Sequence, residues 1–392
     1  GPSAFEATVD PMLQLPDGSV AFREAFAQNF DVASYIDYHI FEIHGQNVDW
    51  IAAPWGQNNV KFFRANTGDG LWRPMLYDTD ACFGAWGTSP YDNYLNLTLN
   101  PPYDSRFTDL FRKVLADDEY QCHFATRTCD LLETSFSAEV FDARLSMAAA
   151  NLAPAMVHHI EQWDSPASLS YWQQRVEHMR NHNEVRASPE RSQVRDEFGY
   201  SAPELLTVNW SPPFGGEVTV NEMVGLGAGW NGEYFGECPI RLAAVPGMGY
   251  GFLGWQNNLH IDMGLVDAND PFVEVALQED DQFFAIFGPC MDGVDVSIQP
   301  TESGLSAAVS GGVQPLVFAW YLNGVLVGQG SGYTPAVPGE YVLTATDGNC
   351  TLITDALNWP VSPEEVVMNV TEHRPTGGVE LELAVSPNPV FN

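Results

Sequence analysis

Basic residues almost disappear from this chain near residue 200, and the hydrophobic pattern changes at the same point. Residues 1–199 hold 28 acidic and 14 basic residues, whereas residues 200–392 hold 23 acidic residues and only two basic ones. Before the break, apolar residues recur at helical spacing; after it, short alternating runs are separated by Gly and Pro. The break therefore predicts a multidomain α+β protein, with a mostly helical first part followed by small all-β domains.

Length and charge narrow the range of possible partners. A chain of 392 residues with 45% hydrophobic residues is long enough for two to four domains with substantial cores. No run of about 18 apolar residues is present, so we expect no membrane span. The net charge of −35 disfavours nucleic acid and anionic membrane surfaces as partners. The chain starts with Gly-Pro-Ser and no signal segment, which predicts a fragment or a processed product.

One hairpin gathers the polar residues that could act together. Residues 60–66 (VKFFRAN) and 71–80 (LWRPMLYDTD) flank the turn sequence at 67–70, which predicts two antiparallel strands. A four-residue loop would place Asn59 opposite Asp78. Asp78 and Asp80 are two residues apart, so on a strand both carboxylates would point to one face. Asp49 precedes the hairpin and could enter the same site from a loop.

A carboxamide beside a carboxylate pair offers the hard oxygen ligands that Mg²⁺ takes. The order also has a precedent in phosphoryl transfer. In protein kinases a catalytic Asp precedes a metal-binding Asn, and an Asp-Phe-Gly-type segment follows after a short hairpin. Here Asp49 is followed by Asn58-Asn59, then the hairpin, then Asp78-Thr79-Asp80 with Phe83-Gly84 close behind. The alternative is that these residues are only turn caps, a common use of Asp and Asn.

The stretch 47–84 resembles the CotH kinase family, a secreted bacterial branch of atypical kinases. The family's DW…NN segment followed by W…YD-x-D…FG is matched in order and spacing, and the likeness extends more weakly to about Gly199. The resemblance implies a kinase-like C-terminal lobe that uses ATP with Mg²⁺ or Mn²⁺. Carried over to this sequence, it makes Asp49 the catalytic base and Asp78 a catalytic carboxylate that also binds metal. It makes Asn59 or Asn58 a metal ligand, and Asp80 either a further ligand or a residue that contacts a ligand.

Two departures qualify this resemblance. Asn58 lies nine positions after Asp49, farther than in the kinase catalytic loop, so the choice between Asn58 and Asn59 is open. The only lysines are Lys61 and Lys113, and neither follows a glycine-rich strand that could grip ATP phosphates. We predict that the nucleotide-gripping N-terminal lobe is missing, with about thirty residues before the first helix. The chain on its own is then expected to be inactive.

Helix signals divide the first part. Asp31 is the predicted N-cap of a helix that reaches Gly45, and further helices are predicted to begin near Ser137, Ser168 and Ser188. Residues 85–103 are rich in Gly, Pro and Asn, which indicates a long loop that is either a substrate lid or a solvated connector. His178 and His182 lack a metal-binding signature, so we expect them on a solvated helix face. Cys122 and Cys129 lie too far apart along one helix to pair with each other.

The second part contains two predicted β modules. Residues 200–289 resemble a bacterial surface β-repeat module. Residues 290–359 are predicted to form an immunoglobulin-like sandwich built around Trp320, in which Cys290 and Cys350 could pair. Aromatic residues within 230–255 suggest either core packing or a polysaccharide-binding platform. Residues 360–392 are predicted to be a linker followed by the start of a type IX secretion sorting domain. That resemblance implies a secreted or cell-surface protein of a Bacteroidetes-type bacterium.

The sequence thus predicts a four-part chain whose first part, residues 1–199, is the kinase-like lobe. The expected activity of the parent protein is transfer of the ATP γ-phosphoryl group to Ser or Thr hydroxyls of extracellular proteins. Two alternatives remain open: a catalytically inert adhesion or structural protein at the cell surface, and a polysaccharide-binding protein. The first hypothesis is favoured because adhesion alone gives no reason to keep Asp49, Asn59 and Asp78 together.

Overall fold

A computed structural model describes most of residues 3–359, with two further strands near the C-terminus. The positions left out between 3 and 359 are 67, 222, 248, 257, 290–293, 302–303, 311–315, 347–350 and 355. The helices before residue 200 are α1 (Ala4–Leu13), α2 (Val20–Asn29), α3 (Val32–Gly45), α4 (Tyr94–Leu99), α5 (Arg106–Leu115), α6 (Asp118–Glu133), α7 (Ala138–Trp163) and α8 (Leu169–Phe198). A hairpin of β1 (Lys61–Arg64) and β2 (Trp72–Met75) and a 3₁₀ turn, η1 (Thr79–Ala81), lie among them.

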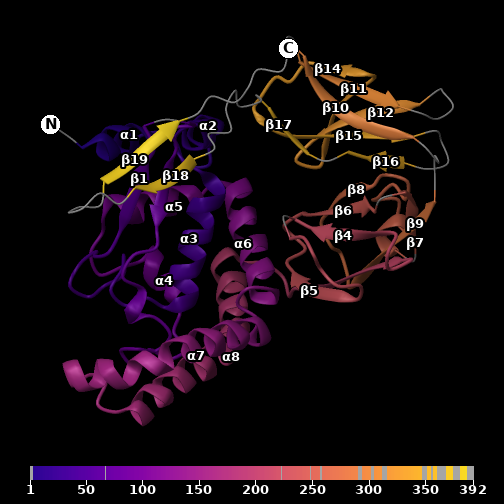
Figure 1. Ribbon diagram of the computed structural model, residues 1–392. Coiled ribbons are helices and arrows are strands. Elements are labelled where there is room, and N and C mark those ends of the chain that lie inside the picture. Colours follow the sequence, from indigo (N-terminus) through magenta and orange to yellow (C-terminus); the bar gives the residue numbers. More distant parts are fainter. Residues whose placement is uncertain are drawn as a thin grey trace.

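The remainder of the described chain is built from strands. They are β3 (Glu204–Ser211), β4 (Gly216–Val220), β5 (Trp230–Tyr234), β6 (Ile240–Pro246), β7 (Tyr250–Gln256), β8 (Phe272–Val275), β9 (Asp281–Pro289), β10 (Asp295–Thr301), β11 (Gly304–Ser310), β12 (Val317–Leu322), β13 (Val325–Gln329), β14 (Gly332–Tyr333), β15 (Gly339–Thr346), β16 (Thr351–Ile353), β17 (Leu357–Trp359), β18 (Met368–His373) and β19 (Glu380–Val385). Only the four-residue α9 (Leu259–Asp262) interrupts them. The predicted change from helices to strands near residue 200 is confirmed (Figure 1).

Two helices precede the predicted first helix, so the expectation of about thirty residues without helix was wrong. Ser3 and Glu6 form a reciprocal capping box at the start of α1, and the Ser19 hydroxyl accepts a hydrogen bond from Phe22 N at the start of α2. Each helix has only ten residues and buries only two side chains, which is why their periodicity was weak. Helix α3 begins after Asp31 and ends at Gly45, as predicted.

The predicted helix start at Ser188 was also wrong, because α8 runs without interruption from Leu169 to Phe198 with Pro189 inside it. A proline within a helix removes one backbone hydrogen bond. Here the turn is retained by buried side chains on both sides of it, Arg186 and Glu190, which contact other elements. The starts after Ser137 and Ser168 and the stop at Gly199 are as predicted.

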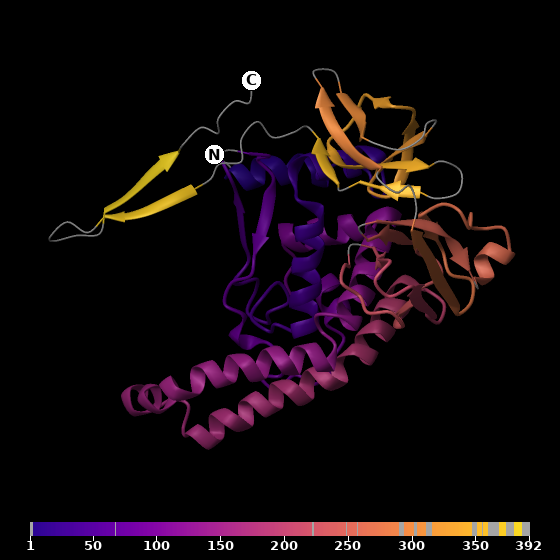
Figure 2. The same ribbon diagram turned by 45° about the vertical axis from the view of Figure 1, so that its right-hand side comes forward.

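Helix α3 lies at the centre of the helical part. Its residues Tyr35 and Ile36 are buried, and the Tyr35 ring contacts Phe26 of α2 and Phe62 of the hairpin. The rings of Phe26 and Tyr35 meet edge to face at 5.1 Å between centroids. Helices α7 and α8 form a long antiparallel pair that projects from this body (Figure 2). Helix α3 ends at Gly45 and leads the chain into the segment that starts at Gln46.

One sheet of the β part includes strands from both predicted β modules. Strands β13-β12-β15-β16-β7-β9-β3-β5 follow one another in a single hydrogen-bonded sheet, in which Thr351 pairs with Phe252. A second small core, which includes Trp320 with no exposed surface, lies between that sheet and β10-β11-β14. The predicted boundary at residue 290 and both cysteines of the proposed 290–350 pair lie outside the described residues, as does the end of the proposed sorting sequence.

The helical and β parts are joined at α6. The Asp130 carboxylate accepts hydrogen bonds from Tyr234 Oη at 2.7 Å and from Asn221 Nδ2 at 2.8 Å. A disulfide connects Cys122 on α6 to Cys238, while Cys129 is buried as a free thiol. Cys122 and Cys129 are thus not paired with each other, as predicted. None of the described helices is long and apolar enough to cross a membrane.

Candidate functional site

The segment after α3 places Asp49 among side-chain amides. Asp49 is partly buried, and its Oδ1 accepts a hydrogen bond from Trp55 Nε1 at 2.8 Å. Asn58 Nδ2 donates to both carboxylate oxygens at 3.0 Å, and Asn59 Nδ2 donates to Oδ2 at 2.9 Å. The sequence prediction that Asp49 and the Asn pair meet therefore agrees with the geometry of this loop.

The two asparagines differ in how firmly they are held. Among the described residues the exposed Asn58 side chain donates only to the Asp49 carboxylate, whereas the partly buried Asn59 side chain also donates to the Asp49 backbone oxygen at 3.2 Å. Both amides donate through Nδ2, so the Oδ1 atoms are left as acceptors for a cation or a further donor. Because Asn59 is fixed at two points, its Oδ1 is the better oriented of the two.

Asp78 and Asp80 do not lie on a strand, so the same-face argument was wrong. Strand β2 ends at Met75; Asp78 then adopts a left-handed conformation (φ 57°, ψ 57°) and precedes η1, which contains Asp80. Both aspartates are exposed, and the Asp78 carboxylate does not cap the turn that follows it. Its oxygens are therefore available to a ligand from solvent.

The hairpin register is shifted by one residue from the prediction. Arg64 pairs with Trp72 and Lys61 with Met75, so the loop is longer than four residues. The Asp69 carboxylate accepts a hydrogen bond from Leu71 N and binds Arg73, which also pairs with Asp31. These side-chain contacts stabilise the wider loop, and turn propensity alone did not reveal them.

Backbone contacts bring the Asp78–Asp80 segment to the Asp49 loop. Phe83 N donates to Gly45 O at 2.7 Å, and Val48 N donates to Ala81 O at 3.4 Å. Asp49 follows Val48 and Asp80 precedes Ala81, so each lies one residue from the second hydrogen bond. The two segments run in opposite directions. The sequence prediction that residues 49 and 78–80 approach one another therefore has a physical basis in the docking of the Phe83-Gly84 segment onto the end of α3.

Several residues in this region have strained backbones. Seven described residues other than glycine have positive φ, and four of them lie in this region with φ between 51° and 57°: Gln46, Asn59, Asp78 and Phe83. This conformation is uncommon, and for a bulky residue such as Phe it is a clear outlier. Such strain persists only where the surrounding structure over-determines it, and it is concentrated at ligand sites and switch regions. The strain therefore marks residues 46–83 as a candidate site independently of any motif.

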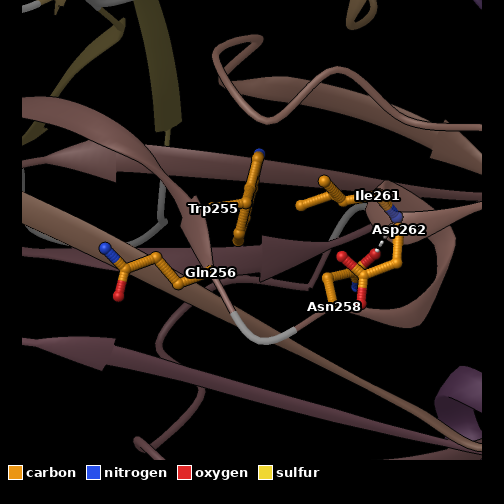
Figure 3. A pocket seen from close by; sticks show the side chains of 5 residues that line it. All are labelled: Trp255, Gln256, Asn258, Ile261 and Asp262. Atoms are coloured by element: carbon orange, nitrogen blue, oxygen red, sulfur yellow. Dashed lines mark hydrogen bonds between the residues drawn. The ribbon is translucent and has the colours of Figure 1, made fainter. Parts of the chain in front are cut away.

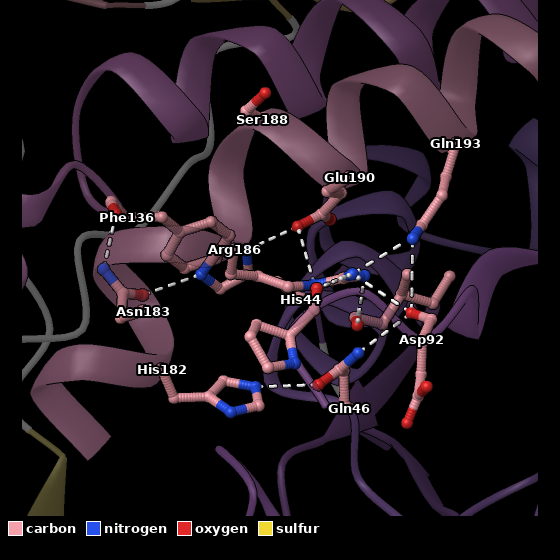
Figure 4. Close-up of polar contacts among 12 residues, drawn as sticks. His44, Gln46, Asp92, Phe136, His182, Asn183, Arg186, Ser188, Glu190 and Gln193 are labelled. Carbon is pink, nitrogen blue, oxygen red and sulfur yellow. Dashed lines mark hydrogen bonds and ion pairs between the residues drawn. The ribbon is translucent and has the colours of Figure 1, made fainter. Parts of the chain in front are cut away.

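A buried polar network behind the site, which the sequence did not predict, holds α8 against the end of α3 (Figure 4). His44 Nδ1 lies 2.6 Å from Glu190 Oε2, and His44 Nε2 lies 2.8 Å from Asn183 Oδ1. His182 Nε2 lies 2.7 Å from Gln46 Oε1. His182 is 3% exposed, so its predicted place on a solvated face was wrong. Desolvation by burial lowers the pKa of His182 to about 4, so it is neutral at physiological pH.

The same network fixes the segment after Gly84. Arg186 is fully buried and donates from Nη1 to the backbone oxygens of Pro90 at 3.0 Å and Asp92 at 3.2 Å. Gln46 Nε2 donates to Asp92 O at 2.9 Å. A Cβ on Gly84 would lie 2.5 Å from His178 Nε2, so this position has room only for glycine. Residues 85–103 thus include a helix, α4, and a tethered stretch, rather than being a lid or connector throughout.

The donor set is compatible with a hard cation. Asn59 Oδ1 and the Asp78 and Asp80 carboxylates are oxygen ligands of the kind that Mg²⁺ and Mn²⁺ bind. Within the described part of the chain, no three His, Cys, Asp or Glu side chains cluster closely enough to form a metal site. Any cation here would therefore need the carboxamide, together with water or a phosphate, to complete its coordination.

Few cations lie close to these acidic groups. Lys113 is buried and bonds to Asp17 at 2.6 Å, so it has a structural role. Lys61 is exposed on β1 with Nζ 5.2 Å from the centre of the Tyr77 ring, directly beside Asp78 in the chain. Arg64, on the same strand, lies over the Trp72 ring. The Lys61 ammonium thus lies beside Tyr77, the residue that precedes Asp78.

A pocket in the β part lacks, among the described residues, a comparable group of carboxylates and amides free to bind a ligand. It has a volume of about 390 Å³ and is lined by Trp255, Gln256, Asn258, Ile261 and Asp262 (Figure 3). Trp255 Nε1 donates to Asp270 O, and Asn258 accepts a hydrogen bond from Ile261 N, so these polar groups serve the fold. Tyr234, Phe235 and Phe252 are buried, which supports core packing over a polysaccharide platform.

Comparison with known proteins identifies one similarity. Residues 3–188 match the model of the family described as CotH kinase protein. This range contains the Asp49 loop, the hairpin, η1 and most of α8, and it ends before the first strand of the β part. No curated protein and no solved structure shows significant similarity to the chain. The similarity therefore concerns the helical part alone.

Proposed function

From this family match we propose that residues 3–188 form a kinase-like module that transfers the γ-phosphoryl group of ATP to Ser or Thr hydroxyls of proteins. The observation that carries the proposal is the Asp49 loop, in which one carboxylate is held by two asparagine amides beside the strained Asp78 turn. Phosphoryl transfer depends mainly on positioning and electrostatic stabilisation, which this arrangement can provide.

In this proposal the oxygen of the acceptor hydroxyl bonds to the γ-phosphorus and ADP departs. The Asp49 carboxylate accepts the proton that the hydroxyl loses. The Asp49 carboxylate already accepts hydrogen bonds from Trp55, Asn58 and Asn59, so one donor must give way to the acceptor hydroxyl. Asn58 is the natural choice, because its side chain is exposed and donates to no other described residue. Asn59 then remains in place, and its Oδ1 is the amide oxygen that would bind the metal.

Mg²⁺ or Mn²⁺, when bound with ATP, would neutralise the charge that develops on the phosphoryl oxygens. Asn59 and Asp78 would hold it, with Asp80 as a further ligand or as the neighbour that orients Asp78. Lys61 would add a positive charge beside Asp78 for a phosphate group. The 3₁₀ turn places these carboxylates at the surface, where a nucleotide can reach them.

We also propose that the protein acts outside the cell or at its surface. The Cys122–Cys238 disulfide is of a kind that persists in oxidising compartments. The 200–392 region has 23 acidic and two basic residues, which suits solubility in a salty environment.

Residues 1–392 alone are expected to bind ATP·Mg²⁺ weakly and to transfer no phosphate at a measurable rate. A triphosphate needs cations or a cradle of backbone N–H groups, and most of the described arginines are paired with carboxylates. Such pairs include Arg23 with Asp117 and Arg127 with Asp37.

Calorimetry with ATP and Mg²⁺, together with radiolabel transfer to a generic Ser/Thr protein, tests both parts of this proposal. Transfer by the full-length protein should disappear in Asp78→Ala and persist in Asp109→Ala, a matched change on α5. Micromolar ATP binding by residues 1–392 that is lost in Asp78→Ala would show that this module suffices by itself. Full-length protein that transfers no label, or transfers it equally well with Asp78→Ala, would overturn the kinase assignment.

A further inference from the structure

Glu42 carries a buried carboxyl group that has no role in the proposed reaction. It lies on the last turns of α3 with no exposed surface, and its Oε1 has no hydrogen-bond partner among the described residues. Burying a polar atom without a partner is costly, and burying an ionised one is more so. A carboxyl group at such a place needs an explanation beyond packing, because Leu or Met would fill the same volume at a lower cost.

The single hydrogen bond of the Glu42 carboxyl leads directly toward the site. Its Oε2 accepts from Asn47 Nδ2 at 2.8 Å, and Asn47 is also fully buried. Asn47 N donates to the Glu42 backbone oxygen at 3.1 Å, so the two residues are joined twice. Asn47 Oδ1 in turn accepts from Asp49 N at 3.0 Å. Glu42, Asn47 and Asp49 thus form one chain of hydrogen bonds from the helix to the candidate base.

We propose that Glu42 is a positioning residue that, through Asn47, fixes the backbone from which the Asp49 carboxylate projects. The inference deepens the proposed function, on which it rests, by assigning a role to a residue that does not touch substrate. Helix α3 ends at Gly45, and the left-handed Gln46 turns the chain away. Without Asn47 held at both ends, the hydrogen bond from Val48 N to Ala81 O at 3.4 Å would be the remaining backbone contact described between Gln46 and Asp49, and the direction of the carboxylate could change.

The surroundings of Glu42 favour its neutral form. Burial raises the pKa of Glu42 to about 7, against a smaller opposite effect of the Asn47 hydrogen bond. The titratable groups that face it are Tyr38 on its own helix and Cys82 in the segment after η1. Burial raises the pKa of both of these groups, so neither is charged near pH 7. Glutamine at position 42 resembles the protonated carboxyl and keeps an oxygen for Asn47 Nδ2.

The indole N–H of Trp55 reports directly on this relay, because it donates to Asp49 Oδ1. Its ¹H–¹⁵N resonance can be followed in residues 1–392 after selective tryptophan labelling, with assignment by Trp55→Phe. We expect Glu42→Gln to leave the resonance at its wild-type position at pH 6, whereas Glu42→Leu and Asn47→Ala should both move it. Ile40→Val, a cavity-forming change on the same helix, should lower stability and leave the resonance in place.

The pH dependence gives a second readout that needs only a conservative variant. In the wild-type protein the Trp55 resonance should shift with a midpoint near pH 7 as Glu42 ionises, and in Glu42→Gln this step should be absent. A wild-type resonance that does not respond between pH 6 and 8, or an identical step in Glu42→Gln, would overturn the proposal. The proposal would also be overturned if Glu42→Leu lowers stability but leaves the Trp55 resonance unchanged, because Glu42 would then have a purely structural role.

An activity readout separates this inference from the proposed function. In the full-length protein, Glu42→Leu should lower kcat at least tenfold and leave the KM for ATP unchanged, while Glu42→Gln retains activity. If the protein transfers no phosphate at all, the proposed function fails and the resonance measurements still decide the positioning role. If transfer occurs and Glu42→Leu has full kcat with a shifted Trp55 resonance, the relay exists but does not serve the reaction, and the proposal is wrong.

Discussion

Replacing Asp49 with asparagine should lower phosphoryl transfer by the full-length protein by about 100-fold or more, the range typical of a general base. The substitution keeps the size of the side chain and removes its ability to take a proton. The oxygen of the introduced amide can still accept from Trp55 and Asn58, but its nitrogen would face Asn59 Nδ2, a donor against a donor. We therefore expect a loss of kcat with little change in ATP affinity.

Initial rates at saturating ATP, with calorimetry of ATP binding, measure this prediction. Asp109→Asn is the matched control: it removes the same charge from α5, where the exposed Asp109 pairs with the half-buried Arg112 side chain, and its rate should equal that of the wild type. If Asp49→Asn keeps more than a tenth of the wild-type kcat, Asp49 is not the base. The Asn58 and Asn59 amides would then hold it for structural reasons only.

Replacing Arg186 with alanine should destabilise the helical part by about 3–5 kcal/mol, because it leaves an uncompensated buried charge. Glu190 Oε2 would keep His44 as a partner but lose the guanidinium 3.6 Å away. The Pro90 and Asp92 carbonyl oxygens would lose their Nη1 donor. Since that donor fixes the segment after Gly84, the site should also loosen.

Denaturant unfolding of residues 1–392 at pH 7 tests this, with Arg195→Ala as the control. Arg195 lies on the same helix, and its pair with Asp196 is solvent-exposed. We therefore expect a cost below about 1 kcal/mol. Equal losses for the two variants would show that the buried network contributes no more than a surface pair.

Acid should weaken the same network. Burial alone would raise the pKa of Glu190, but its interactions with His44 and Arg186 outweigh this effect and hold that pKa below its ordinary value. A carboxyl whose folded-state pKa is depressed stabilises the protein above its unfolded pKa, and this contribution is lost as the pH falls through the folded value. The Arg186→Ala cost should therefore shrink as acid protonates Glu190.

The sequence predicted those features of the fold that local signals determine. The helix-to-strand change near residue 200, α3 and its Asp31 cap, and the starts of α7 and α8 all follow from periodicity and capping residues. Pro189 misled the prediction because buried contacts of Arg186 and Glu190 outweigh a lost backbone hydrogen bond. The hairpin register was missed because Asp69 and Arg73 stabilise a wider loop through side-chain bonds that turn propensity does not include.

The candidate site was predictable in part for similar reasons. The polar residues at 49, 58 and 59 are close in sequence, and their spacing indicated a shared site. Glu42, Asn47 and Trp55 were missed because their roles depend on a loop conformation set by left-handed Gln46 and Asn59. The contacts of His44 and Gln46 with α8 span more than a hundred residues, and no periodicity indicates such pairs. An Arg-Glu pair four residues apart was the only local sign of this network.

The central claim is that Asp49, Asn59 and Asp78 surround one cation site, and paramagnetic broadening by Mn²⁺ tests it most directly. Residues 1–392 contain 11 tryptophans, and Trp55 is the one bonded to Asp49. Substoichiometric Mn²⁺ should broaden the Trp55 indole N–H resonance before the others. The Mn²⁺ needed should rise at least tenfold in Asn59→Ala and Asp78→Ala, and it should be unchanged in Asp262→Ala, a matched exposed aspartate of the β part. Broadening that spares Trp55, or that is the same in Asp78→Ala as in the wild type, would contradict the account.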